Sequence, residues 1–180
     1  MRSEDITSLF YCTQRRIMLK FYDIDKNYIN FLKTLDRQVP NIEYTSNNKF
    51  VCGIVLEVNE VKYYAPISHK TEKQQTNLQI FDNEKPISTI RFSFMVPAYS
   101  EVLKVKDFQD IAKTDSDYAA LLRAEYSYCS SHIKNIQDKA LAVYKIGCNK
   151  THRLNYTCCD FKKLENEYMK YDKTKIYPKV

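Results

Sequence analysis

The sequence has no tryptophan, only two glycines and no long apolar run. A membrane-spanning helix needs roughly 18 or more consecutive apolar residues, and no segment approaches that length, so we expect no membrane partner. The first residues, MRSEDITSLFYCTQRRI, begin with acidic side chains and lack the continuous apolar core of a secretory signal. We therefore expect a cytoplasmic protein.

Metal-binding and disulfide patterns are also missing. The six cysteines form no CxxC pair and have no zinc-ligand spacing with the three histidines. The carboxylates are scattered along the chain rather than gathered into the acidic cluster that two-metal phosphodiester hydrolysis uses. These patterns favour reduced, structural cysteines and no metal or other cofactor.

Tyrosine and basic residues are plentiful. There are fifteen tyrosines, and Lys plus Arg exceed Asp plus Glu by 28 to 22, for a net charge of +6. A tyrosine ring can stack on an unpaired RNA base, and a basic excess suits a polyanionic partner. The same composition also follows from an AT-rich genome, so it does not decide the function.

The hydrophobic pattern predicts one α+β domain of 180 residues, large enough to bury a core. Asp25 can cap a helix whose apolar residues recur at helical spacing through Leu35, and Asp115 and Asp160 can cap two more helices. We expect strands at 19–24, 50–56, 61–65, 78–81, 87–96, 102–105 and 154–158, and helices at 26–35, from 115 to about 147 and after 160. The sheet is expected to be a compact, highly twisted antiparallel sheet or partly open barrel, with added long helices. Residues 1–17 are predicted to be an extension, 18–172 the single domain and 173–180 a basic tail.

Polar side chains gather where the strand pattern of residues 49–73 ends, after Pro66. Ser68, His69, Lys70, Thr71 and Lys73 follow in quick succession. A hydroxyl, an imidazole that titrates near neutral pH and ammonium groups are what RNA phosphodiester cleavage uses. They are also what an ordinary polar loop contains.

Three stretches together resemble the ToxN/AbiQ/CptN family of endoribonuclease toxins from type III toxin–antitoxin systems, and the CptN-like branch in particular. They are KFYDIDKNYINFLKTLDRQVPN, KFVCGIVLEVNEVKYYAPISHK and FSFMVP, at 20–41, 49–70 and 92–97. The resemblance implies a barrel-like fold similar to the MazF/Kid toxins and metal-independent RNA cleavage that leaves 2′,3′-cyclic phosphate and 5′-hydroxyl ends. It also implies a small repeat-derived RNA antitoxin, folded as a pseudoknot, which the toxin processes and which inhibits it in a closed toxin–RNA hetero-oligomer. Such toxins are sequence-specific, with a preference for A-rich RNA; they act on cellular or phage RNA and inhibit growth, in abortive infection or plasmid maintenance.

The resemblance also implies the site residues. Family members usually read Ala-Pro-Leu-(Ser/Thr)-Ser-Pro-Lys at the strand exit, where this chain reads APISHK at 65–70. Ser68 matches the first hydroxyl, His69 stands where the second would be, and Lys70 comes one residue early, with Lys73 as the alternative. A tyrosine and a lysine upstream match Tyr44 and Lys49 approximately. The expected catalytic residues are Ser68, His69, Lys70, Lys49 and Tyr44, with Lys49 or Lys70 holding the phosphate; the expected RNA contacts are Lys73, Thr71, Arg91, Lys26, Lys33 and Tyr28.

Several alternatives stay open at this point. The departure at His69 allows a non-catalytic RNA-binding or RNA-sequestering protein, and a metal-dependent nuclease is a third reading. Tyr28 has helical spacing with Leu32, which favours burial in the core over RNA contact. His132 and His152 are expected to be structural or to lie at the rim of an RNA surface.

Overall fold

The computed structural model describes residues 18–43 and 49–175, which form seven strands, five α-helices and several short 3-10 turns within these ranges. The predicted extension 1–17, Tyr44 and the last five residues lie outside the described residues. The strands are β1 (Lys20–Ile24), β2 (Val51–Val58), β3 (Val61–Ser68), β4 (Asn77–Asp82), β5 (Lys85–Arg91), β6 (Val96–Pro97) and β7 (Leu103–Val105). The helices are α1 (Lys26–Leu35), α2 (Phe108–Ala112), α3 (Ser116–Ser131), α4 (Ile133–Cys148) and α5 (Phe161–Glu167), and the 3-10 turns include η2 (Phe92–Phe94), η4 (Asn155–Thr157) and η5 (Tyr168–Lys170).

All strand pairs are antiparallel, in the order β4-β5-β3-β2-β1-β7, with β6 paired to β3. No pairing of β4 with β7 closes the sheet within the described ranges, so the expected α+β antiparallel sheet is confirmed in its open form. The likeness to MazF/Kid toxins stays a prediction. β3 is the central strand because it pairs with β2 along one edge and with β6 and then β5 along the other.

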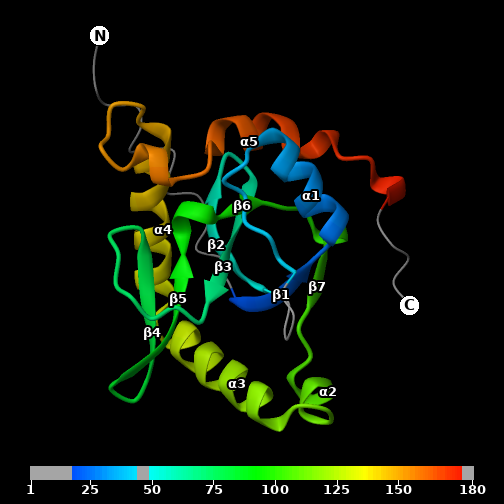
Figure 1. The fold of residues 1–180 in the computed structure, drawn as a ribbon, viewed down its shortest axis with the longest axis vertical. Helices are drawn as coiled ribbons and strands as arrows, with labels where there is room; N and C mark the ends of the chain where they lie inside the picture. Colours follow the sequence, from blue (N-terminus) through cyan, green and yellow to red (C-terminus); the bar gives the residue numbers. More distant parts are fainter. Residues whose placement is uncertain (1–17, 44–48, 176–180) are drawn as a thin grey trace.

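The helices cover the sheet at its ends and along one side (Figure 1). α4 packs against β2, α3 packs against β4, and α5 contacts both α1 and β6. Their apolar faces and the inner face of the sheet form one core. The predicted caps are confirmed: the carboxylates of Asp25, Asp115 and Asp160 accept hydrogen bonds from the first turns of α1, α3 and α5, as helix N-termini require.

The predicted thirty-residue helix is two helices. His132, with φ −120° and ψ 26°, separates α3 from α4. The Ser131 hydroxyl donates to the Ser127 carbonyl, and the His132 ring stacks on Tyr128 with centroids 4.0 Å apart. Serine side chains that bond to the backbone compete with helix formation, and the break lets each helix bury its own apolar stripe against a different part of the sheet.

The strand predicted over 87–96 ends at Arg91. The chain then turns through η2, which buries Ser93 and Met95 and leaves Phe94 half-exposed. Strict alternation would have pointed Ser93 and Met95 to solvent. The strand predicted at 154–158 is likewise wrong, because the 3-10 turn η4 forms there at Asn155–Thr157.

Tyr28 is a core residue. Its side chain is 0% exposed, its hydroxyl donates to the Pro97 carbonyl at 2.7 Å, and its ring packs edge-on against Tyr99 and Tyr171. The expected RNA contact by Tyr28 is therefore wrong, because no face of the ring reaches the surface.

Candidate active site

The candidate site lies at the end of β3. Pro66, predicted to end the strand, lies within it: it pairs with Val51 of β2, and the strand continues to Ser68. Beyond Pro66 the pairing moves to β5, with Ser68 opposite Thr89. Ser68 is therefore the last strand residue and is 8% exposed, and strand pairing fixes its backbone.

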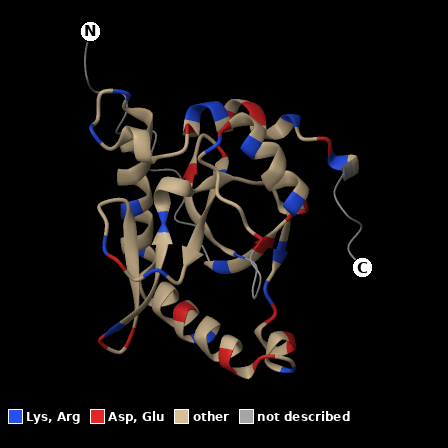
Figure 2. Ribbon diagram, viewed as in Figure 1, with Lys and Arg blue, Asp and Glu red and all other residues tan. Residues whose placement is uncertain are grey.

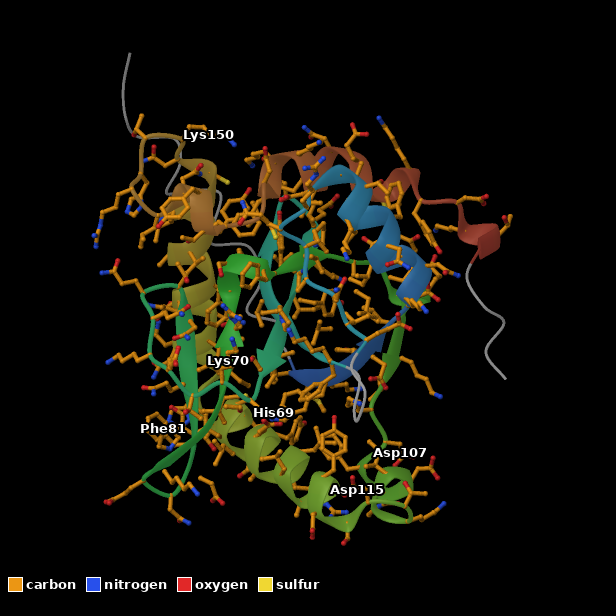
Figure 3. The ribbon with its side chains drawn as sticks, in the orientation of Figure 1. His69, Lys70, Phe81, Asp107, Asp115 and Lys150 are labelled. Carbon is orange, nitrogen blue, oxygen red and sulfur yellow. The ribbon has the colours of Figure 1, made fainter. Side chains whose placement is uncertain are left out.

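The loop that follows β3 leaves the sheet with His69 and Lys70 exposed (Figure 3). The backbone N–H of Lys70 donates to the Ser68 Oγ at 3.3 Å, and the Thr89 hydroxyl donates to the Lys70 carbonyl at 2.9 Å. Because the Ser68 oxygen accepts this bond, its own O–H is left to donate to a ligand. β5 and the strand end thus hold the backbone of Lys70 while both side chains face outward.

The rest of this loop is also tied to the sheet by side chains of β4. The Gln79 amide donates to the Thr71 carbonyl at 2.7 Å, and the Asn77 side chain bonds to Glu72 and Gln74. Lys73 is exposed on this loop. Polar side chains that bond to loop backbone fix its conformation, so residues 69–76 form a defined surface beside the strand end.

A pocket of about 310 Å³ opens beside β3 and β5. Its lining includes four cationic side chains and no carboxylate among the described residues. Figure 2 shows basic residues on α1 and β5, which border it. The lining residues are Lys33, Arg37, Gln38, Val39, Pro40, Asn41, Lys49, Pro66, Arg91 and Phe94.

The pocket and Ser68 lie on one face of the sheet. Side chains two apart on a strand point to the same side. Pro66 and Arg91 line the pocket, so Ser68, two residues after Pro66, and Thr89, two residues before Arg91, also point to that side. The pocket therefore lies on the face of the sheet to which Ser68 points, although Ser68, His69 and Lys70 are not among its lining residues.

The structure brings together one residue expected to be catalytic, Lys49, and two expected to contact RNA, Lys33 and Arg91. Lys33, Lys49 and Arg91 line the pocket, although they come from three separate segments. The backbone of Lys49 is held by a hydrogen bond, which its N–H donates to the Ile42 carbonyl at 2.8 Å. Lys26 lies at the other end of α1, outside the pocket lining, and forms an ion pair with Glu43 at 2.5 Å.

Among the pocket residues that sequence reasoning missed, Arg37 adds a charge and Phe94 adds an aromatic ring. Arg37 lies two residues beyond the end of α1, four residues after Lys33, and this nearness to another cation is the one signal that could have indicated it. Phe94 was expected in a strand, and only the η2 turn brings it to the pocket. The Arg91 guanidinium lies 4.7 Å from the centroid of the Phe94 ring, which orients the charged group and leaves its edge for an anion.

Within the described residues, no group of three or more His, Cys, Asp or Glu side chains is placed to hold a metal ion. The same part of the chain contains no helix that is long and apolar enough to cross a membrane.

Comparisons with known proteins show similarity to one family of toxins along most of the chain. Residues 20–170 match the family described as toxin ToxN, type III toxin–antitoxin system. The endoribonuclease ToxN of Bacillus thuringiensis subsp. kurstaki is 27% identical over 162 residues, which cover 84% of this chain and 84% of that protein. The endoribonuclease AbiQ of Lactococcus lactis subsp. lactis is 23% identical over 189 positions, covering 96% of this chain and 100% of AbiQ.

Solved structures share the fold. A chain from a study of selective toxin inhibition by a non-coding RNA pseudoknot, in bacterial type III toxin–antitoxin systems, superposes with a TM-score of 0.79 at 25% identity. The match covers 86% of this chain and 98% of that one. The structure of AbiQ, a lactococcal anti-phage endoribonuclease, superposes with a TM-score of 0.76 at 22% identity, with the same coverage.

Proposed function

The chain belongs to the ToxN family of type III toxin–antitoxin systems, and from that premise we propose that it is an endoribonuclease toxin that cleaves single-stranded RNA without a metal ion. Its reaction is transesterification within the RNA. The O2′ of one nucleotide attacks the adjacent phosphorus and loses its proton, the P–O5′ bond breaks, and O5′ takes up a proton. The products are a 2′,3′-cyclic phosphate and a 5′-hydroxyl.

Residues at the end of β3 are proposed to carry out this reaction. His69, exposed beside the strand end, exchanges one of the two protons; an imidazole can act as acid or base near neutral pH. Ser68 donates a hydrogen bond to a phosphoryl oxygen. Lys70 is the candidate for the second proton transfer; Tyr44, the alternative that the family resemblance implies, lies outside the described residues. Cationic groups held in place stabilise the charge that develops on the phosphoryl oxygens.

The basic pocket beside Ser68 is the observation that carries this proposal. Lys49 and Arg91 line it, on the face of the sheet to which Ser68 points. A pocket of this size, with four cations and no carboxylate in its described lining, favours a polyanion over a neutral ligand. Lys33 and Arg37 extend the positive surface toward α1, where a neighbouring phosphate of the RNA would bind. Lys73 and Thr71 extend it along the loop after β3.

The proposed partner is a repeat-derived RNA antitoxin that folds as a pseudoknot, inhibits the toxin in a closed toxin–RNA assembly and is processed by it from a longer precursor. A solved relative is associated with toxin inhibition by such an RNA. We place this chain in the bacterial cytoplasm, where cellular and phage RNA are substrates and where cleavage would stop growth and abort infection.

Alanine variants at the strand end test the assignment. Ser68→Ala, His69→Ala and Lys70→Ala should each lower cleavage of an A-rich RNA, by about 10²–10⁴-fold where a proton-transfer group is lost, with RNA binding retained. Lys113→Ala is the matched control, because Lys113 is an exposed lysine just after α2 that pairs with Asp110 and does not line the pocket. Full activity in all three variants would place the site elsewhere, and intact RNA with the wild-type protein would leave a non-catalytic RNA-binding protein.

A further inference from the structure

The segment between α4 and α5, residues 149–157, presents a tyrosine to solvent. Tyr156 is 76% exposed, more than any other large hydrophobic side chain in the described ranges. The segment reads NKTHRLNYT, so Lys150, His152 and Arg153 accompany the ring and the segment contains no acidic residue. An exposed aromatic ring among cations is the combination that binds unpaired nucleotides, with a base on the ring and phosphates on the cations.

This segment is held in one conformation by its own side chains. The Asn155 amide donates to the carbonyls of Ile146 and Gly147, at 3.2 and 2.6 Å, which occupies acceptors at the end of α4. Asn149 accepts from the backbone and the hydroxyl of Thr151, at 3.0 and 2.8 Å. Because these bonds already order the backbone, a ligand that stacks on Tyr156 would lose little of its binding energy to ordering the loop.

A hydrogen bond joins this segment to the candidate active site. The Arg153 guanidinium donates to the Gln75 side chain at 3.1 Å, and Gln75 belongs to the same loop as His69 and Lys70. Five residue steps separate Lys70 from Gln75, a span of at most roughly 17 Å. The bond therefore places the segment that carries Tyr156 beside the loop that begins at His69, within the reach of several nucleotides.

The charges along this surface favour RNA. Lys70, Lys73, Lys150 and Arg153 are exposed along it. The opposing carboxylates are Glu72, on the loop, and Asp160, which pairs with Lys150 at 3.3 Å. Figure 3 places Lys150 near the end of α4, on the side of the molecule along which the loop from Lys70 rises.

We propose that Tyr156, with Arg153 and Lys150, binds unpaired nucleotides of an RNA whose scissile phosphate lies at Ser68–Lys70. A base stacks on the Tyr156 ring, and the phosphates that connect it to the cleavage site run along Lys73 and Arg153. The inference rests on the proposed function for the position of the scissile phosphate. It predicts that the enzyme prefers RNA long enough to reach both places.

RNA length provides the test. Binding is measured with His69→Ala protein and fluorescein-labelled A-rich RNAs of roughly four and roughly twenty nucleotides, a range that brackets known single-strand site sizes. Adding Tyr156→Ala should weaken binding of the long RNA by about 10- to 100-fold, the effect of losing one base–aromatic stack, and leave the short RNA unchanged. Tyr156→Phe should bind both RNAs as the parent does, because the ring face is kept. Met169→Ala, which removes another exposed apolar side chain, is the matched control.

The measurements either support or overturn the binding of RNA at Tyr156. Equal loss for both RNAs, or no loss with Tyr156→Ala, overturns the inference. With catalytically intact protein, Tyr156→Ala should raise KM for the long RNA and leave kcat unchanged. If the wild-type protein cuts no RNA, the proposed enzymatic function fails, and the length-dependent binding still tests this surface independently.

Discussion

The buried carboxyl of Glu125 should make the protein less stable as the pH rises from about 4.5 to about 7. Glu125 lies on α3 with 0% exposure, and neither of its carboxylate oxygens has a hydrogen-bond partner in the described residues. The Ser88 hydroxyl is close enough to lower the pKa slightly, but no hydrogen bond joins the two groups. Burial dominates and raises the pKa of Glu125 from 4.5 to about 7, because a charge without partners is costly in the core.

The sign and size of the effect follow from proton linkage. Between pH 4.5 and 7 the unfolded chain releases this proton and the folded protein retains it, so the free energy of unfolding decreases as the pH rises. Below pH 4.5 both states hold the proton and the full stability is present; above about 7 both have released it and the loss is complete. A change in pKa from 4.5 to about 7 corresponds to about 3 kcal/mol, a large part of the roughly 5–15 kcal/mol that stabilises a domain.

Urea unfolding at pH 5 and pH 8 measures this effect in the wild type and in Glu125→Gln, which keeps the shape and cannot ionise. Because part of the effect has already occurred at pH 5, the wild type should lose about 2.5 kcal/mol more than the variant between the two pH values. The neighbouring thiol of Cys52 does not interfere, since burial raises its pKa further above this range. The same pH dependence in both proteins would refute the reasoning; Glu125→Leu is a second variant for the comparison, should the glutamine variant fail to fold.

Two further substitutions test the packing that supports the site. Gly53→Ala should destabilise the fold by about 1–3 kcal/mol or more, because a Cβ there would lie 2.1 Å from a ring carbon of Tyr64 on β3; thermal unfolding that matches the wild type would contradict this close packing. Tyr28→Phe should lower the free energy of unfolding by about 1 kcal/mol, because it removes the buried hydrogen bond to the Pro97 carbonyl. Tyr156→Phe, at an exposed position, should leave the melting temperature unchanged. Equal effects of the two substitutions would argue against the buried bond.

Helix starts could be predicted from the sequence because they depend on local chemistry. Asp25, Asp115 and Asp160 cap helices as expected, since a cap needs only a carboxylate and the N–H groups two or three residues later. The end of α3 could not be predicted in the same way. Serine bonding and ring stacking interrupt the helix at His132, within a pattern whose apolar spacing continues without a break.

In the candidate site, too, only the residues that are neighbours in the sequence could be predicted. Ser68, His69 and Lys70 are contiguous, so the end of one strand was enough to indicate them. The pocket beside them takes Arg37 from the chain after α1 and Phe94 from a turn after β5. No spacing within either segment links them, because only the antiparallel pairing of distant strands brings these segments together. The catalytic roles of the predicted residues remain predictions until variants are assayed.

The ends of the cleaved RNA test the central claim most directly. Purified protein is incubated in EDTA with an A-rich RNA and with the same RNA carrying a 2′-deoxy nucleotide immediately 5′ to the cleaved bond. The account predicts cleavage of the first RNA to 2′,3′-cyclic phosphate and 5′-hydroxyl ends and none of the second, because the attacking oxygen is missing. Cleavage that requires a divalent metal ion, or that survives the 2′-deoxy substitution, would contradict it.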